Sequence, residues 1–332
     1  MQIPVKYLRN GDPIPGIGLG TFGSDRYDPP TVSDAVRKAI DMGYRLIDCA
    51  SVYGNEHLIG DILSEVCRDP ANPVSRSDLF VISKVWNDSH GHRDVYLSCM
   101  QSLKDLQLEY LDLYIVHWPF PNFHPKGAPP DYHHPDARPY IHERFMETWR
   151  QMERLQQAGF VRHIGTSNMT LPKLEKLVQD CVIMPSANEM ELHPTFQQPD
   201  LFDYCRKLNI LPVGYSPLGS PSRPERDKTP DDLVDMEQAA VVSIANKHGL
   251  HPAQVCLKWA VQRGQVPIPF SVKEKQLLSN LAAVSGEPLS DEEMNSLKAV
   301  NCDNRLIKGQ VFLWDGAKDW RDLWDLNGQI TS

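Results

Sequence analysis

The chain has 332 residues, of which 41% are hydrophobic and 23% are charged, so it holds ample apolar material for a sizeable core. Its formal net charge of −9 argues against a nucleic-acid partner or an anionic membrane surface, because both require a basic face. The seven cysteines form no CxxC pair, which is typical of free thiols in a reducing compartment.

The N-terminal sequence MQIPVKYLRNGD lacks the apolar run of a signal peptide. No window of the chain approaches the roughly 20 apolar residues that a membrane span requires. We therefore predict a cytoplasmic protein without a membrane partner.

Short apolar runs alternate with segments of helical periodicity along the whole chain, which indicates strands followed by helices. The predicted strands lie at 14–23, 46–50, 79–84, 111–118, 161–168, 186–192, 210–216 and 266–271. The predicted helices lie at 56–66, 94–106, 143–157, 171–178, 199–208, 237–248, 252–262 and 274–284.

This alternation favours parallel strands joined by crossover helices, and eight such units predict an α/β fold of the (β/α)₈ TIM-barrel type. We expect residues 1–332 to form a single domain, with a C-terminal tail at about 300–332 whose aromatic side chains must cover something. The alternative is an open doubly wound sheet, but GIGLGTFG lacks the G-x-G-x-x-G spacing, and Asp28-Pro29-Pro30 follows before any helix.

Ionisable and polar side chains come at the ends of neighbouring predicted strands: Asp48, Lys84, His117 and Asn168. Tyr53 follows Asp48 after a short loop. Taken singly, these residues are more often a helix cap, a solvated lysine, a core histidine or a packed ring. Because strand ends of a barrel converge on its catalytic mouth, the set favours a catalytic site.

The chemistry that this set suits is proton transfer coupled to hydride transfer. A phenol titrates near ~10, so Tyr53 is a weak acid unless its anion is stabilised. We expect the Lys84 cation to lower that pKa by roughly 1–3 units, with Asp48 holding Lys84 charged. Tyr53 would then protonate a carbonyl oxygen, which His117 positions. No credible metal-ligand spacing is found in the sequence.

Seven segments, in this order, resemble the aldo-keto reductase family. They are DCASVYGNE, ISKVWN, YLDLYIVHWP, HIGTSN, ELHP, YSPLGS and IPFS. The resemblance implies a (β/α)₈ barrel that binds a nicotinamide dinucleotide in extended form without a Rossmann domain. It also implies a catalytic tetrad of Asp48, Tyr53, Lys84 and His117.

By the same resemblance, Ser167 and Asn168 bind the nicotinamide carboxamide, Tyr215 stacks on its ring, and the loop from Ser216 covers the pyrophosphate. The implied cofactor-binding residues are Thr21, Phe22, Asp48, Ser167, Asn168, Glu189, Tyr215, Ser216, Leu218, Ser220, Phe270, Ser271, Lys273, Gln276 and Asn280. The implied substrate-binding residues are Phe22, Tyr53, Trp86, His117, Trp118 and Trp314. The tail around 312–314 closes the mouth, although Trp314 fits plain packing equally well.

Three departures from the family pattern concern the cofactor. Glu189 replaces the usual glutamine beside the carboxamide, which brings charge into the site. Phe270 and Gln276 replace the lysine and arginine that grip the 2′-phosphate of NADPH, and losing both cations weakens discrimination for a dianionic phosphate. We predict binding of NADP(H) with relaxed discrimination against NAD(H). Lys273, Arg223 and Arg226 are candidates to compensate.

The implied activity is reduction of aldoses, small aldehydes or ketones to alcohols. The histidine-rich insertion at 123–136 favours a solvated loop that shapes substrate choice over a metal site. The alternatives are a non-catalytic cofactor-binding subunit on the same barrel and a metal-dependent barrel hydrolase. We take a monomer as the default, and a dimer stays open.

Overall fold

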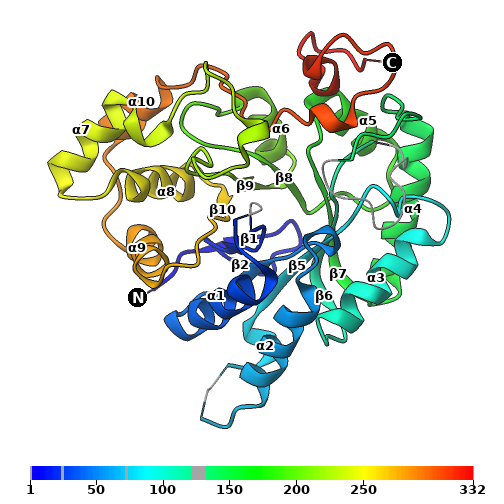
Figure 1. Cartoon of the computed structure of the whole chain (residues 1–332), viewed down its shortest axis with the longest axis horizontal. Coiled ribbons are helices and arrows are strands. Elements are labelled where there is room, and N and C mark those ends of the chain that lie inside the picture. The colour runs from blue at the N-terminus through cyan, green and yellow to red at the C-terminus, as the bar shows by residue number, and fades with distance from the viewer. Residues whose placement is uncertain (1, 24–25, 72–73, 121–131, 332) are drawn as a thin grey trace.

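The computed structural model describes residues 2–23, 26–71, 74–120 and 132–331. Within these residues, eight parallel strands form one sheet in which each strand pairs with the next along the chain (Figure 1). The strands are β3 (Leu19–Gly20), β4 (Leu46–Asp48), β5 (Phe80–Val85), β6 (Leu111–Val116), β7 (Val161–Ser167), β8 (Ala187–Glu191), β9 (Leu211–Tyr215) and β10 (Val266–Pro267).

The sheet closes on itself where its first and last strands meet. The Gly18 N–H donates to Pro267 O at 3.0 Å, and the Gly20 N–H donates to Pro269 O at 3.1 Å. The predicted barrel is therefore confirmed, and the open doubly wound alternative is excluded. Gly18 lies at a tight point of the ring, since a Cβ there would come within 2.1 Å of the Leu46 side chain.

Helices follow the strands and surround the barrel (Figure 1). Their bounds are α1 (Pro29–Met42), α2 (Glu56–Arg68), α3 (Asp94–Asp105), α4 (His142–Gln157), α5 (Leu171–Asp180), α6 (Pro199–Lys207), α7 (Ala239–His248), α8 (Pro252–Arg263), α9 (Glu274–Ser285) and α10 (Asp291–Lys298). All eight helices expected from the sequence are present, with ends that differ by up to two residues.

The sequence did not predict α1, α10 or the antiparallel hairpin of β1 (Val5–Tyr7) and β2 (Pro13–Pro15). Helix α1 begins at Pro29 because proline is well tolerated in a first helical turn. Asp28 caps that turn by accepting from the Thr31 N–H at 3.0 Å. Helix α10 begins with a capping box formed by Ser290 and Glu293.

The side chains alternate across the strands and divide the core in two. Inward-facing residues fill the barrel, and outward-facing residues pack against the helices. In β5, for example, Ile82 belongs to the inner cluster, whereas Val81 and Val85 belong to the outer one. A period of two from Ile82 directs Lys84 to the same inner face. The same alternation from Leu46 directs Asp48 inward.

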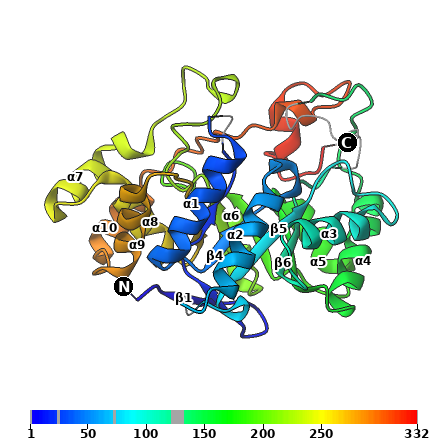
Figure 2. The ribbon, with the colours of Figure 1, turned by 60° about the horizontal axis from the view of Figure 1, so that its bottom comes forward.

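The two ends of the barrel are covered differently (Figure 2). The β1–β2 hairpin covers the end where the strands begin, and its Ile14 is fully buried in the inner cluster. The C-terminal tail and the long loops lie over the other end. The strands finish at this second end, so the side chains at their carboxyl ends gather there.

A buried ion cluster anchors the tail to the barrel. His193, just after β8, lies 2.9 Å from carboxylate oxygens of both Glu191 and Asp235. The Glu191 carboxylate also accepts from the backbone N–H groups of Leu306 and Ile307 at 2.7 and 3.0 Å. Burial acts to lower the pKa of His193, but the two carboxylates outweigh it and raise that pKa to about 9.

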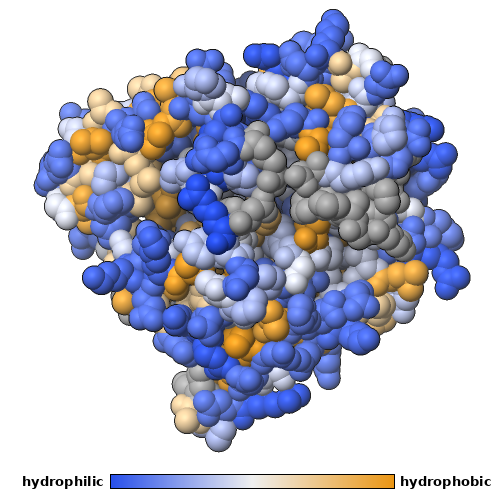
Figure 3. Space-filling model, viewed as in Figure 1, coloured by the Kyte–Doolittle hydropathy of each residue, from blue (hydrophilic) through white to orange (hydrophobic). Residues whose placement is uncertain are grey.

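All seven cysteines are free thiols. On the face shown in Figure 3, hydrophobic side chains lie in small separate groups among hydrophilic ones. None of the helices in the described ranges has the length and apolar character needed to cross a bilayer.

Candidate active site

A cavity of about 690 Å³ lies at the end of the barrel where the strands finish. Strand ends, the loop after β9, the start of α9 and the tail all line it. Of the residues predicted as functional, all except Lys84 and Trp314 line this cavity. The inward alternation along each strand explains the convergence, because the last inward position of a strand faces the mouth.

Lys84 lies beneath the cavity floor and is fully buried. Its ammonium forms an ion pair with Asp48 and lies 3.5 Å from Oε1 of Glu189. It also donates to the carbonyl oxygen of Cys49 at 3.0 Å. Burial acts to lower the pKa of Lys84, but the two carboxylates outweigh it and raise that pKa, so the lysine is a cation.

Tyr53 is at the end of a 3₁₀ turn, Ser51–Tyr53, that follows β4 after Cys49 and Ala50. Its ring centroid lies 5.5 Å from the Lys84 ammonium, so the phenol and the cation share one end of the barrel. Burial raises the pKa of Tyr53, and the Lys84 charge only partly opposes the rise. The lowered phenol pKa expected from the sequence is therefore not found in this site, because desolvation outweighs the cation.

His117 follows β6 and meets Tyr53 edge-on, with ring centroids 5.8 Å apart. Burial and then the Lys84 charge lower the pKa of His117 well below its usual range, so the imidazole is neutral. Its Nδ1 is buried and has no hydrogen-bond partner among the described residues. Trp86 lies on another side of the ring, with centroids 5.0 Å apart.

Asn168 links three strand ends through its side-chain amide. Its NH₂ group donates to His117 O at 2.9 Å and to Ser167 Oγ at 3.0 Å, and its oxygen accepts from the Tyr215 hydroxyl at 2.7 Å. Asn168 has a φ of 58°, a left-handed conformation that asparagine tolerates better than most residues. This network holds together the part of the cavity wall that the ends of β6, β7 and β9 form.

Glu189 lies beside Ser167 in the β7–β8 register and is 3% exposed. One carboxyl oxygen faces Lys84, and the other, Oε2, is buried without a hydrogen-bond partner in the described part of the chain. Burial raises the pKa of Glu189 to about 8, and the Asp48 carboxylate adds to the shift. Besides Tyr53, the site thus holds a carboxyl whose pKa lies between that of an ordinary carboxyl and that of a phenol.

The loop after β9 is held in one shape by its own polar groups. The Ser220 hydroxyl donates to Ser216 Oγ at 2.7 Å. Arg223 forms an ion pair with Asp232 and donates to the backbone oxygen of Gly219 at 3.4 Å. Arg223 therefore ties the loop together. The side chain of Arg226, the other arginine considered, lies outside the described residues.

The far end of the cavity is formed by the segment between β10 and α9. Phe270 lies against Tyr27, with ring centroids 5.8 Å apart. The Ser271 hydroxyl donates to Gln276 at 2.6 Å and accepts from the Lys273 backbone N–H at 3.0 Å. Sequence reasoning missed several lining residues here, among them Arg26, Tyr27, His251 and Lys275. One sequence signal could have pointed to this end of the cavity: the two lysines, Lys273 and Lys275, at the start of α9.

The aromatic end of the cavity is shared by strand ends and tail. Trp118 lies 4.6 Å from Phe312, centroid to centroid, and Trp86 lies 5.9 Å from the same ring. Residues 309–312 of the tail line the cavity. Trp314 packs against the adjoining aromatic cluster, whereas Phe312 reaches the lining.

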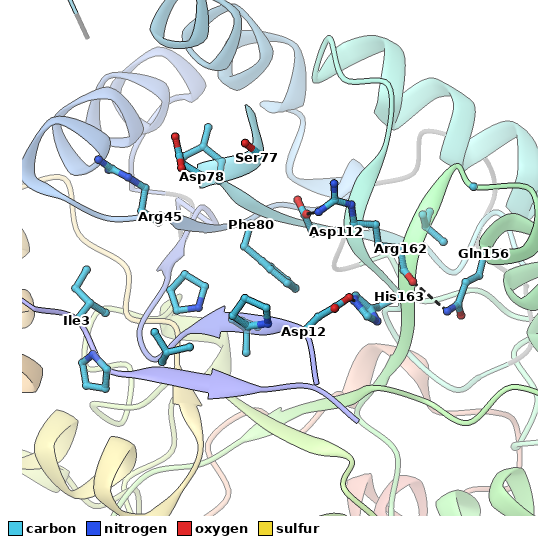
Figure 4. A pocket seen from close by; sticks show the side chains of 18 residues that line it. Ile3, Asp12, Arg45, Ser77, Asp78, Phe80, Asp112, Gln156, Arg162 and His163 are labelled. Atoms are coloured by element: carbon cyan, nitrogen blue, oxygen red, sulfur yellow. Dashed lines mark hydrogen bonds and ion pairs between the residues drawn. The ribbon is translucent and has the colours of Figure 1, made fainter. Parts of the chain in front are cut away.

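A second cavity, of about 810 Å³, lies beneath the hairpin at the opposite end of the barrel (Figure 4). Its charged groups are engaged with other parts of the fold: Arg45 donates to the backbone oxygens of Ile40 and Tyr44, and Asp78 accepts from Ser75. Arg162 lies 3.5 Å from Asp112, and His163 lies 3.0 Å from Asp12. Gln156 donates to the Arg162 carbonyl at 3.0 Å. These pairings suit a structural role, so the catalytic chemistry is sought at the other end.

Residues 121–131, which include most of the histidine-rich insertion, lie outside the described residues. Within the part of the chain that is described, no group of three or more His, Cys, Asp or Glu side chains is arranged to hold a metal ion.

Known proteins resemble this chain in sequence and in fold. The model of the "Aldo/keto reductase family" matches residues 16–302. "Aldo-keto reductase family 1 member A1-A" of Danio rerio is 38% identical over 316 residues, covering 95% of this chain and 94% of the relative. An aldo/keto reductase of Synechocystis sp. is 37% identical over 324 residues, covering 96% of this chain and 95% of that protein.

A solved structure, that of an aldo-keto reductase enzyme from a Medee basin deep-sea metagenome library, superposes with a TM-score of 0.75. Its sequence is 31% identical, and the match covers 90% of this chain and 96% of that one. The fold and these relatives define an oxidoreductase built on a (β/α)₈ barrel. The chain belongs to the aldo/keto reductase family, whose members use nicotinamide cofactors, generally NADP(H).

Proposed function

We propose that the protein reduces carbonyl groups of aldoses or small aldehydes to alcohols, with Tyr53 as the proton donor. The observation that carries the proposal is the arrangement of Asp48, Tyr53, Lys84 and His117 at one end of the barrel, around the cavity floor. The family membership supports the reaction class.

The cavity suits a nicotinamide dinucleotide in its polarity and layout. Ser167, Asn168 and Glu189 form a polar wall, and Glu189 Oε2 offers a buried acceptor that has no partner in the described chain. A carboxamide NH₂ would satisfy that acceptor. The other end, near Phe270 and Lys273, would take the adenosine half. When bound, the reduced cofactor supplies the hydride.

The residues around the reacting carbonyl have distinct tasks. The neutral ring of His117 orients the carbonyl oxygen, and the Tyr53 hydroxyl gives that oxygen its proton as negative charge develops there. The raised pKa of Tyr53 keeps the phenol protonated at neutral pH, which suits a proton donor. The Lys84 cation stabilises the phenolate left behind, and Asp48 holds Lys84 in place.

The aromatic end binds the rest of the substrate. Trp86, Trp118 and Phe312 present apolar surface beside His117, and tail residues 309–312 close the mouth over the substrate. Apolar walls around a few polar groups suit small aldehydes and the carbon skeleton of an aldose.

The cofactor preference is expected to be relaxed. Phe270 and Gln276 offer no cation to a 2′-phosphate, whereas Lys273, Lys275 and Arg26 line the same end of the cavity. Exposed cations of this kind discriminate weakly. Comparing kcat/KM for NADPH and NADH tests the proposal, and a preference for NADPH above about a thousandfold would contradict it.

The test of the reaction is oxidation of NADPH with DL-glyceraldehyde or xylose by the wild type, Tyr53→Phe and Tyr7→Phe. Tyr7 lies exposed on the hairpin and serves as the matched control. Tyr53→Phe should lose turnover and keep cofactor affinity, and Tyr7→Phe should retain both. Cofactor binding without turnover by the wild type, across aldehydes and aldoses, would favour the non-catalytic alternative.

A further inference from the structure

We propose that Glu189 makes the affinity of this site for the oxidised nicotinamide nucleotide rise with pH more steeply than the affinity for the reduced form. The inference deepens the proposed function and rests on it, since it places the nicotinamide beside Ser167 and Asn168. Its basis is a cluster of one buried cation and two buried carboxylates at the cavity floor.

The charges in this cluster do not balance when every group is ionised. Lys84 carries one positive charge, whereas Asp48 and Glu189 together carry two negative ones. Neither the Lys84 ammonium nor the Asp48 carboxylate is exposed by more than a few per cent, so water screens the excess weakly. One proton therefore belongs to the pair of acids over part of the pH range.

Glu189 is the acid that has an oxygen left for a ligand. Both Asp48 and Glu189 line the cavity, and their carboxyls lie close enough to share that proton. Asp48 is engaged with the Lys84 ammonium, whereas Glu189 Oε2 is buried and accepts from no donor in the described chain. Burial raises the pKa of Glu189 to about 8. The pair of acids then holds one proton at pH 6.5 and has lost it by pH 9.

The other titratable groups around Glu189 keep their charge over this range. Burial raises the pKa of Tyr53 and of Tyr215, so both phenols stay neutral. The pKa of His117 is well below its usual range, and that of Lys84 is raised. The change of charge at the cavity floor between pH 6.5 and 9 therefore comes from the two acids.

The two redox states of a nicotinamide respond differently to this charge. Both forms carry the carboxamide that Glu189 would bind, but the oxidised ring is a cation and the reduced ring is neutral, so an ionised Glu189 attracts the oxidised form more strongly. By linkage, binding of the oxidised form must then release a proton from the acid pair. A glutamine at this position, having no charge, would give neither effect.

The experiment measures dissociation constants of NADP⁺ and NADPH by protein fluorescence at pH 6.5 and 9, and proton release in weak buffer at pH 8. For the wild type, the NADPH-to-NADP⁺ ratio of dissociation constants should rise about tenfold between these pH values, as one pKa unit of linkage implies. NADP⁺ should release protons in excess of NADPH. Phosphate titration cancels in this comparison, since both forms carry the same phosphates.

Glu189→Gln should abolish both the change in ratio and the excess proton release. Glu56→Gln is the matched control, because Glu56 is also buried, has a pKa raised to about 7, and lies outside the cavity lining. It should keep the wild-type behaviour. Equal pH dependence for both nucleotides in the wild type overturns the inference alone. Failure of either nucleotide to bind at any pH overturns the proposed function as well.

Discussion

The ammonium of Lys84 lies 3.5 Å from Oε1 of Glu189, on a lysine that also holds an ion pair with Asp48. The single Lys84 cation thus lies against two buried carboxyl groups. Removing one partner from a buried charge cluster is strongly destabilising, because the remaining charges lose their compensation without regaining water.

Lys84→Met should therefore lower the free energy of unfolding by about 3–5 kcal/mol at pH 9, where both acids would have to be ionised. At pH 6 the loss should be smaller, because Glu189 is protonated there. Urea unfolding at the two pH values measures the difference. Adding Glu189→Gln should restore part of the stability at pH 9, and an equal loss at both pH values would contradict the prediction.

Glu56 should weaken the fold as pH rises. Its carboxyl accepts from Ser83 at 2.5 Å and from Ser102 at 2.9 Å, and burial raises its pKa to about 7. An acid whose folded pKa is raised favours the folded state less as pH passes from about 4.5 through about 7. Glu56→Gln should hence gain about 1–3 kcal/mol at pH 8.5 and little at pH 4.5, measured by denaturant unfolding.

His193 should make the fold less stable in alkali. Its pKa is raised to about 9 by Asp235 and Glu191 against the effect of burial. Its contribution is therefore complete below the unfolded pKa of about 6.5 and is lost as pH rises through about 9, a change of about 3 kcal/mol. Unfolding free energies across this range check the sign.

The cluster of His193, Glu191 and Asp235 should also control how firmly the tail is attached. Asp235→Asn should lower the pKa of His193, so the alkaline loss should begin at a lower pH than in the wild type. Limited proteolysis should then cut residues 300–332 sooner at pH 8. An unchanged pH profile in this variant would show that the cluster does not govern the attachment of the tail.

Lys273 and Lys275 should affect NADPH more than NADH. Both are exposed at the Phe270 end of the cavity, where we propose that the adenosine half binds, so each should add at most about 1 kcal/mol toward a 2′-phosphate. Lys273→Met and Lys275→Met should each raise KM for NADPH up to about fivefold and leave KM for NADH unchanged. Lys298→Met, on α10, is the control. Equal effects on both cofactors would argue for a general loss of packing.

The barrel and the floor of its cavity could be predicted from the sequence because both follow a local rule. Alternation along β5 puts Ile82 and Lys84 on one face, and the parallel arrangement brings Asp48 and His117 to the same end. Helix α1 was missed because Asp28-Pro29-Pro30 was taken to precede any helix, although Asp28 caps the helix that begins at Pro29. The raised pKa of Tyr53 was missed because desolvation depends on the whole enclosure.

Other parts depend on contacts between distant segments, which no local pattern encodes. Tyr27 and Phe270 meet across the far end of the cavity, although more than two hundred residues separate them. Phe312 reaches the lining while Trp314 packs beside it, and composition does not distinguish these two tail aromatics.

The hydrogen bonds that close the barrel run in one direction. They go from the N–H groups of Gly18 and Gly20 to the carbonyl oxygens of Pro267 and Pro269. Proline carries no N–H, so these two residues can only accept, and every donor across the join belongs to a glycine. Half of an ordinary ladder is therefore missing where the ring begins and ends. We expect the barrel to open locally at this join before it opens elsewhere. Hydrogen exchange at the Gly18 and Gly20 amides should therefore precede exchange at the β5–β6 ladder.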